Sequence, residues 1–566
     1  MVDPITIEVI RNALSYSAEE MGIALRNSAY SHNIKERMDH SCAIFNINGD
    51  MVAQAEHIPV HLGSLPHGIK NAINYLTERG EAFRPGDIFL FNDPYISGTH
   101  LNDVTLIKPV FYKGKHVGFT ANKAHHVDVG GKTPGSMSGD ATELYQEGII
   151  IPPVRFVSSG KINEDILAIF TENVRTPHIT RGDLRAQIAA NNLGERRILE
   201  LIDRYGVEVY LQALEEILNY SERRMVEEIR EIPNGTYDAE DCLEDTGVSD
   251  KPVWIRVKLI VSDGTMTIDY TGTDKQVNGP INAVFGVTLS ATYFAIKSVV
   301  DPEVPMNQGA MRPLKVIAPK GTLVNPYKPA PVSGGNVETS QRIADVMFKA
   351  LSKALPYKVP AASLGSMNNI MAGGYDPQRK RPWAFYETIG GGSGARPFED
   401  GVDGIHTNMT NTLNTPIEAI EQYYPIEFVS YEFREESFGA GRYRGGVGIV
   451  RSWRLTAPRA TVSILAERVK VTPYGVQGGL PGKSAEFFLI KKDGSRKRLP
   501  GKVTVELKNG DIIEINTAGG GGYGPPDERD PDAIKQDIEN ELLKTEWEKY
   551  VEENRKIKRD CTDLEK

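Results

Sequence analysis

Residue types that commonly bind divalent metals are concentrated between positions 93 and 131 of this 566-residue chain. The segment opens with Asp-Pro-Tyr-Ile-Ser-Gly-Thr-His-Leu-Asn-Asp and closes with His-His-Val-Asp-Val-Gly-Gly, so it supplies His100, Asp103, His125 and His126. Neutral imidazole and carboxylate oxygen together suit zinc, manganese or iron. The segment therefore predicts a metal site, although an isolated His-x-x-Asp is more often a surface pair or a helix cap.

Two predicted strands position these side chains. Residues 104–112 and 116–124 have the alternation of half-buried strands, and Lys-Gly-Lys between them is typical of a hairpin turn. Continuing the alternation of the second strand puts His125 on the same side as Phe119 and His126 on the opposite side. We therefore expect His125 to be a ligand, and His126 to support the site or contact substrate.

Further site candidates lie upstream. Asp39 directly precedes a predicted strand at 42–47, where its carboxylate either caps a turn or serves as a fourth ligand. His57 and His61 flank a proline, which predicts a loop before a helix at 65–78. We expect this loop either to cap the helix or to bind substrate.

Composition narrows the function classes. The chain is 40% hydrophobic and 25% charged, as in globular proteins, and its net charge of -10 with a pI near 5.7 argues against a nucleic-acid partner. It has no predicted signal peptide and no apolar segment near the roughly 20 residues of a membrane span. Three distant cysteines, an odd number, predict reduced thiols and a cytoplasmic protein.

The length requires several domains. We expect an α+β, multi-domain fold: an N-terminal α/β region with long helices and the metal site (1–232), a central α/β region with Gly-rich loops (233–426), a β-rich domain (427–529) and a charged surface helix (530–566). Long helices are predicted at 4–31 and at 182–229, the latter capped by Asp183 and broken at Gly206.

The central region contains a Gly-rich loop at 329–338 that leads into a helix predicted at 339–354. Such a loop can hold an anion at the helix N-terminus. This loop lacks the Gly-Lys-Ser/Thr element of a P-loop, so a structural turn is the favoured interpretation and no ATP site is predicted here.

These motifs together resemble the hydantoinase B/oxoprolinase family. The resemblance rests on Asn-Ile-Lys-Glu-Arg-Met-Asp-His-Ser-Cys (33–42), the 57–66 and 93–103 segments, His-His-Val-Asp-Val-Gly-Gly-Lys-Thr-Pro-Gly-Ser-Met (125–137), Ser-Gly-Gly-Asn-Val-Glu-Thr-Ser-Gln (333–341) and the glycines of 518–524. They follow the family order over nearly the whole chain.

The resemblance implies a subunit of an ATP-dependent cyclic amide hydrolase that opens hydantoin, 5-oxoproline or lactam rings. It implies Asp39, His100, Asp103 and His125 as metal ligands. It also implies a hydantoinase A-type partner that binds ATP and Mg²⁺, in a hetero-oligomer such as A2B2 or larger.

In the mechanism that the resemblance implies, the partner phosphorylates the amide carbonyl oxygen, and water activated by the metal then attacks the carbon of the phosphorylated amide. Asp39 or Asp103 takes the proton of the water. His57, His61 and His126 orient the intermediate. Two alternatives remain: a subunit of an ATP-dependent ketone carboxylase, as in acetone and acetophenone carboxylases, and a non-catalytic scaffold subunit.

Overall fold

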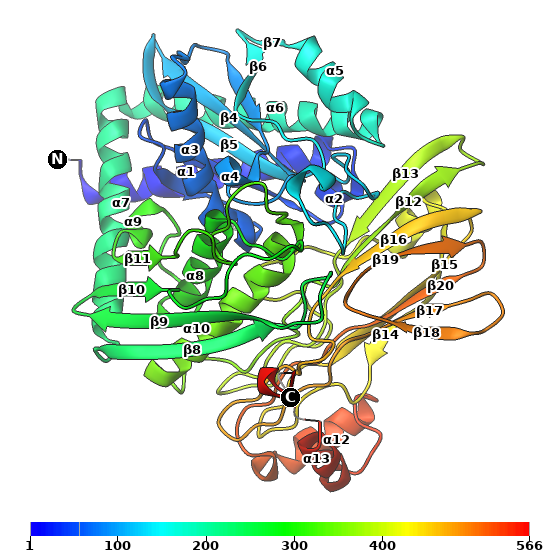
Figure 1. Cartoon of the computed structure of the whole chain (residues 1–566). Coiled ribbons are helices and arrows are strands. Elements are labelled where there is room, and N and C mark those ends of the chain that lie inside the picture. Colours follow the sequence, from blue (N-terminus) through cyan, green and yellow to red (C-terminus); the bar gives the residue numbers. More distant parts are fainter. Residues whose placement is uncertain (1, 56, 558, 565–566) are drawn as a thin grey trace.

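A computed structural model describes residues 2–55, 57–557 and 559–564. In Figure 1 the first half of the chain forms one body around a large sheet, and the later strands form two further sheets beside it. The helices near the C-terminus lie at the far end of the second body. The α+β, multi-domain expectation agrees with this arrangement.

The first body is built on a seven-stranded antiparallel sheet with the order β2-β1-β5-β4-β3-β6-β7. Helices cover both faces: α1 and α6 pack on one, and α3 packs on the other. The strand ends in the middle of this sheet are therefore inside the protein. The strands are β1 (His40–Phe45), β2 (Met51–Gln54), β3 (Ile88–Phe91), β4 (Asp103–Tyr112), β5 (Lys115–His125), β6 (Val154–Ser158) and β7 (Lys161–Ile162).

The first helix, α1 (Pro4–Ser28), begins where the sequence predicts, because Asp3 accepts a hydrogen bond from the Thr6 backbone N–H and Pro4 occupies the first turn. It ends three residues before the predicted 31. The short helix α2 (His32–Lys35) follows after its cap Ser31 and leads to Asp39.

The loop predicted around His61 is wrong. Helix α3 spans Pro59–Glu78 and contains His61 and Pro66, while His57 lies outside it. Pro59 is accepted because the first turn needs no N–H donor. Pro66 lies inside the helix, which local preference disfavours, but the surrounding turns are almost wholly buried and packing outweighs that preference.

Asp183 is not the cap that the sequence predicted. Helix α6 spans Pro177–Tyr205, so Asp183 is within its second turn, where its carboxylate accepts hydrogen bonds from the backbone N–H groups of Tyr30 (2.7 Å) and Ser31 (3.0 Å). The break at Gly206 is as predicted, and α7 (Val207–Arg230) follows it. The short helices α4 (Pro94–Ser97) and α5 (Glu164–Glu172) complete the helices before residue 232.

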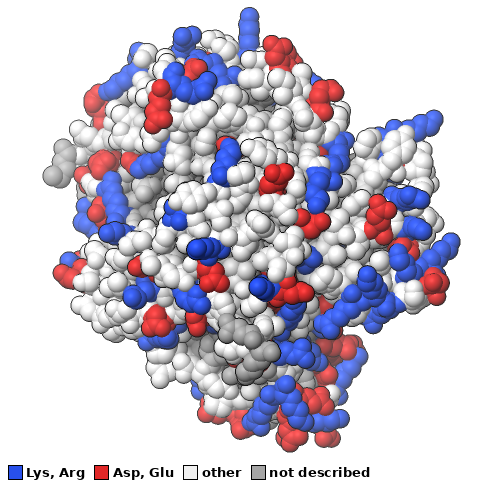
Figure 2. Space-filling model, viewed as in Figure 1, with Lys and Arg blue, Asp and Glu red and all other residues white. Residues whose placement is uncertain are grey.

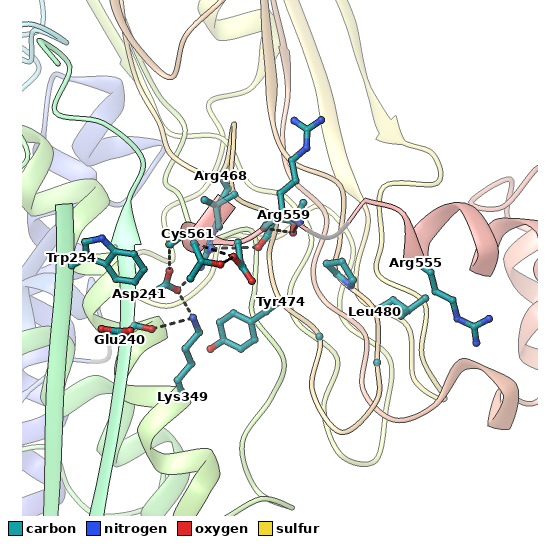
Figure 3. Close-up of a pocket in the computed structure, with 17 residues that line it drawn as sticks. Glu240, Asp241, Trp254, Lys349, Arg468, Tyr474, Leu480, Arg555, Arg559 and Cys561 are labelled. Carbon is teal, nitrogen blue, oxygen red and sulfur yellow. Dashed lines mark hydrogen bonds and ion pairs between the residues drawn. The ribbon is translucent and has the colours of Figure 1, made fainter. Parts of the chain in front are cut away.

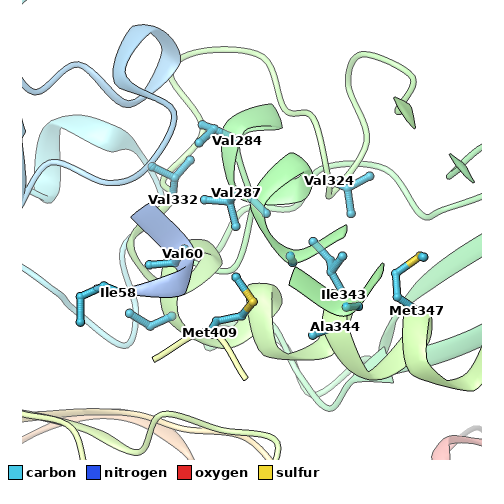
Figure 4. Packing of buried hydrophobic residues seen from close by; sticks show 14 of the residues in the cluster. Ile58, Val60, Val284, Val287, Val324, Val332, Ile343, Ala344, Met347 and Met409 are labelled. Atoms are coloured by element: carbon cyan, nitrogen blue, oxygen red, sulfur yellow. The ribbon is translucent and has the colours of Figure 1, made fainter. Parts of the chain in front are cut away.

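A second, four-stranded sheet has the order β11-β10-β9-β8. Its apolar residues join a core that includes α8, α10 and the start of α3, and Figure 4 shows Val60 close to Met409 and to Val287 of α8. The elements are β8 (Gly235–Leu243), β9 (Val253–Ser262), β10 (Thr265–Asp269), α8 (Phe285–Val300), α9 (Gln308–Met311), β11 (Leu314–Ile317) and α10 (Ser340–Ala354), the last preceded by one π-turn at Gly335–Thr339.

The remaining strands form two sheets that pack on a shared core. Their orders are β13-β12-β16-β19 and β14-β15-β20-β17-β18, so the first sheet joins strands from both sides of the expected boundary at 426. The elements are β12 (Asn369–Asp376), β13 (Arg381–Glu387), α11 (Ile417–Tyr423), β14 (Ile426–Arg434), β15 (Gly448–Leu455), β16 (Arg459–Leu465), β17 (Glu486–Ile490), β18 (Arg496–Leu499), β19 (Lys502–Lys508) and β20 (Ile512–Asn516).

The single surface helix predicted after 530 is wrong. The segment forms two helices, α12 (Pro531–Glu539) and α13 (Trp547–Arg555), separated by a turn in which Glu541 has a φ of 59°. Leu543, Trp547 and Tyr550 of this segment are buried against Phe438. The segment after 530 is rich in charged residues, and for that reason its apolar side, which packs on the β-rich body, was not predicted.

The expectation of reduced thiols also fails for two of the three cysteines. Cys242 in β8 and Cys561 near the C-terminus form a disulfide, while Cys42 is free and buried. Figure 3 shows Cys561 above Asp241, whose carboxylate pairs with Lys349 at 3.0 Å. A sequence separation of 319 residues gave no spacing cue for this bond.

Basic and acidic side chains are interspersed on the face of the molecule in Figure 2. Within the described residues, no helix combines the length and apolar character that crossing a bilayer would require.

Candidate metal centre

Two strand ends and one turn bring three of the predicted ligands together. Asp103 is the first residue of β4 and His125 is the last residue of β5, and the two are directly paired across the antiparallel strands. His100 lies in the turn between α4 and β4, which Gly98 enters with a φ of 82°. Directly opposed side chains on paired strands are neighbours, so the strand register itself makes the cluster.

The ligand atoms of His100, Asp103 and His125 lie within 4.8 Å of one another. The Oδ1 atom of Asp103 is 3.2 Å from Nε2 of His100 and 3.3 Å from Nε2 of His61. All four side chains are at most 2% exposed. The site is therefore an interior one.

The polar atoms of this cluster are unsatisfied. Neither ring nitrogen of His100, neither carboxylate oxygen of Asp103, nor Nε2 of His125 makes a hydrogen bond within the described residues, because the two imidazole nitrogens near Oδ1 of Asp103 approach it at unfavourable angles. Buried polar atoms are almost always hydrogen-bonded, so several orphaned donors and acceptors at one point call for an explanation. A divalent cation fits them, because its ligands are neutral imidazole nitrogens and carboxylate oxygens.

The local electrostatics suit the same interpretation. Burial alone would raise the pKa of Asp103, but His100 and His61 lower it well below its usual range, so the group is a carboxylate. Burial and the neighbouring His100 lower the pKa of His125, so its ring is neutral. A deprotonated carboxylate and a neutral imidazole are the forms that bind a metal.

Asp39 lies at the edge of this cluster. It lines a cavity of about 10 Å³ together with His61, Asp103, His125 and Tyr386. Its carboxylate is 4.0 Å from the Arg37 guanidinium, and burial raises its pKa. The structure therefore brings three of the four predicted ligands into one cluster and puts the fourth on the wall of the adjoining cavity.

His125 is held by residues that the sequence did not single out. Its Nδ1 atom is 3.0 Å from the Asn33 amide nitrogen, and the Tyr386 ring stacks on it with centroids 4.4 Å apart. Arg37 donates to the Asn33 side-chain oxygen at 3.1 Å. Asn33 lies within one of the family motifs, but Tyr386 comes from β13, far along the chain, and no spacing pointed to it.

The other predicted contact residues, His57, His61 and His126, do not all face the cluster. His61 faces the cluster through Asp103. His57 lies between β1 and α1: its ring centroid is 4.9 Å from that of His40, its Nδ1 accepts from the Cys42 backbone N–H, and its Nε2 is 3.8 Å from the Glu19 carboxylate of α1. His126 lies on the opposite side of β5, where its Nε2 is 2.9 Å from the Gln187 side-chain oxygen of α6.

The π-turn at Gly335–Thr339 also borders the cavity, so the loop predicted at 329–338 ends earlier than expected. Asn336 and Val337 of this turn line the cavity, and the segment before it is fixed by Glu147, whose carboxylate accepts from the backbone N–H groups of Val332 and Ser333. Burial raises the pKa of Glu147 to about 7. Sequence reasoning missed Glu147, because an isolated glutamate beside a Gly-Ile-Ile-Ile run carries no pattern.

The whole chain is similar to known proteins. The family model described as Hydantoinase B/oxoprolinase matches residues 3–526. An uncharacterised protein of Methanocaldococcus jannaschii is 53% identical over 96% of this chain and 94% of its own length. A Pseudomonas sp. protein, named as the putative B component of a D-/L-hydantoinase, is 34% identical over 95% of this chain and 92% of its own length.

Longer and solved relatives extend the comparison. The 5-oxoprolinase 1 of Arabidopsis thaliana is 37% identical over 93% of this chain, which spans 42% of that protein. The crystal structure of an ATP-dependent caprolactamase from Pseudomonas jessenii superposes with a TM-score of 0.89 at 29% identity, over 98% of this chain and all of that one. A nucleotide-free acetone carboxylase structure has a TM-score of 0.91 at 21% identity, over 98% of this chain and 79% of that one, which shows a shared fold.

Proposed function

This chain belongs to the hydantoinase B/oxoprolinase family, and on that premise we propose that it is the metal-dependent subunit of an ATP-dependent cyclic amide hydrolase. One observation carries the proposal: the buried cluster of His100, Asp103 and His125, whose ligand atoms make no hydrogen bond within the described residues. The relatives named for hydantoin, 5-oxoproline and caprolactam supply the substrate class.

The metal would be held by His100, Asp103 and His125, with Asp39 completing the set from the cavity wall. When bound, a divalent ion of this kind supplies Lewis acidity and lowers the pKa of water to near neutrality. Zinc, manganese and iron all suit these ligands.

The chain's own residues provide the rest of the chemistry. The cavity beside the cluster has about the volume of one water molecule, and Asp39 borders it. When it is not itself bound to the metal, Asp39 suits removal of a proton from an attacking water, because burial raises its pKa and makes its carboxylate a stronger base than an exposed aspartate; Asp103 would take this role if Asp39 were bound. Nε2 of His61 lies 3.3 Å from Oδ1 of Asp103, and this contact helps to hold that carboxylate toward the cluster.

The cavity of about 10 Å³ is too small for a lactam ring. Substrate therefore enters only if the segments that close the cavity move, and these include Val337 of the π-turn and Thr410. A partner that docks and delivers an activated substrate is consistent with such a closed site.

We assign the ATP and Mg²⁺ site to a hydantoinase A-type partner. This chain has no P-loop sequence, and one relative is named as one component of a hydantoinase. An unstrained amide resists water, and phosphorylation of its carbonyl oxygen by the partner would make it a better electrophile. This division of labour requires the two subunits to associate, and we propose a hetero-oligomer of A2B2 or larger.

The experiment reconstitutes the chain with its A-type partner and measures ATP-dependent opening of hydantoin, 5-oxoproline and caprolactam, with metal content measured in parallel. His100→Ala should lose both metal and ring opening. Full activity with normal metal content in that variant would refute the proposal.

A ketone carboxylase component is the second candidate, favoured by the fold shared with acetone carboxylase. Product formation from acetone or acetophenone that requires bicarbonate would establish it in place of ring opening. A scaffold role predicts a pure protein without stoichiometric metal and a partner that is equally active alone.

A further inference from the structure

A cavity of about 550 Å³ lies outside the metal cluster, where α2, the N-terminus of α6 and the β12–β13 hairpin meet. Figure 1 shows α2 at the edge of the first body, facing this hairpin. The volume is in the range of small-molecule sites. The proposed ring-opening chemistry does not use this cavity.

The cavity has an excess of positive charge. Its charged lining residues are Lys35, Arg175, Arg379, Arg381 and Asp376. Arg175 and Arg379 are already paired, with Asp128 at 2.9 Å and with Asp376 at 2.7 Å. Lys35 and Arg381 are exposed, and across the described residues their side chains have no ion pair or hydrogen bond. Two cations are therefore available to a ligand.

The N-terminus of α6 adds a third source of positive potential. This helix is 29 residues long, its first turn holds no acidic residue, and its cap Thr176 makes no side-chain capping bond. Thr176 is 7% exposed, lines the cavity, and its Oγ1 has no partner within the described residues. An uncapped helix N-terminus with an unpartnered hydroxyl attracts an anion.

The same cavity presents several aromatic rings. Tyr30 and His178 meet edge to face with centroids 5.3 Å apart, and His32 and Tyr423 do so at 4.6 Å. Tyr30 is 56% exposed and Tyr423 is 47% exposed. Exposed rings beside free cations suit a flat ring that carries an anionic group.

The cavity and the metal cluster share α2. His32 and Lys35 line the cavity, while Asn33 between them contacts His125. An occupant of the cavity would therefore touch the helix that holds a predicted metal ligand in place.

The geometry points to a second binding site in this chain, formed by Lys35, Arg381 and the N-terminus of α6, for a small anion that carries a flat ring. The anionic group, a phosphate or a carboxylate, binds the two cations and the helix N-terminus, and the ring packs against Tyr30 and Tyr423. The evidence for this second site does not depend on the proposed ring-opening activity.

Calorimetric titration of the full chain tests the proposal with two matched probe pairs, AMP against adenosine and benzoate against benzamide. The first pair tests a phosphate and the second a carboxylate. We expect at least one charged probe to bind at least about tenfold more tightly than its uncharged counterpart, and the double variant K35A/R381A to lose that difference. The variant K161A/R459A, which removes an exposed lysine and arginine elsewhere, should bind like the wild type.

Two results would overturn the proposal: no binding of either charged probe at several millimolar, or equal binding by the wild type and K35A/R381A. Both substituted side chains are exposed, so melting curves should show an intact fold. Tyr423→Ala provides a second test, since it should weaken AMP binding without changing the affinity for inorganic phosphate. Ring opening assayed without these probes is unaffected by the outcome, so the two proposals fail separately.

Discussion

Asp103→Asn is the most direct test of the metal centre. The substitution keeps the size of a fully buried side chain and removes the one carboxylate that lies within 3.3 Å of two imidazoles. The unsatisfied atoms of the cluster mean that a bound cation should stabilise the folded chain, because the unfolded chain has no such site. The stabilisation is therefore expected to depend on Asp103.

The size of the effect follows from binding linkage. At a free metal concentration of about 100 times Kd, the wild type should gain about 2.7 kcal/mol in free energy of unfolding. If loss of the carboxylate weakens binding about 100-fold, also about 2.7 kcal/mol, the same concentration equals the new Kd and the gain falls to about 0.4 kcal/mol.

Denaturant unfolding of chelator-treated protein, with and without added Zn²⁺ or Mn²⁺, measures this gain. Asp87→Asn is the matched control, because Asp87 is equally buried in the same region but pairs with Arg155 at 2.6 Å and not with the cluster. It should lower stability equally with and without metal. A full metal-dependent gain in Asp103→Asn, or its loss in Asp87→Asn, would show that the cluster is not the site.

Three further outcomes are expected. Burial raises the pKa of Glu147 from 4.5 to about 7, so the folded chain binds the carboxyl proton of Glu147 more tightly than the unfolded chain does. The free energy of unfolding should therefore decline by about 3 kcal/mol as the pH rises from about 4.5 to 7. In unfolding measured against pH, Glu147→Gln should remove that decline. Titration of thiols in denatured, unreduced protein should find one per chain, since Cys242 and Cys561 are joined. Gly22→Ala would put a methyl group 2.3 Å from the His57 ring and should lower the free energy of unfolding by about 1–3 kcal/mol.

Exposed neighbours provide the controls. Glu143→Gln should leave the pH profile unchanged, and Ser28→Ala, on the exposed end of the same helix as Gly22, should unfold like the wild type. Three results would contradict the packing seen in the structure. They are a pH profile of Glu147→Gln that equals that of the wild type, three free thiols before reduction, and a free energy of unfolding of Gly22→Ala that equals that of the wild type.

The predictable part of the site was the part governed by short-range geometry. Alternation along β5 placed His125 and His126 on opposite faces, and the contacts with Asp103 and Gln187 agree with that prediction. The pairing of His125 with Asp103 follows from a hairpin whose turn was visible in the sequence. Strand period and turn chemistry are local, so one sequence is enough to infer them.

The parts that could not be predicted depend on distant packing. Tyr386 reaches His125 from β13, and Cys561 reaches Cys242 from the last described turn, at separations where no periodicity operates. The start of α3 was mispredicted because Pro59, between His57 and His61, suggested a loop, whereas Pro59 occupies the first turn of the helix, where no N–H donor is needed. Asp183 was misassigned because α6 begins at Pro177, so Asp183 lies within the helix and its carboxylate accepts from residues outside it.

The cavity wall also determines what a shortened chain can do. Asp39, His61, Asp103 and His125 come from the first quarter of the sequence, yet Met367, Tyr386 and Thr410 close the space around them. A fragment ending near residue 232 would keep every candidate ligand but open the centre to bulk solvent, where water would hydrate the ion and compete for its ligands. Splitting the gene at that point should therefore give halves that regain tight metal retention only when they are mixed and reassociate.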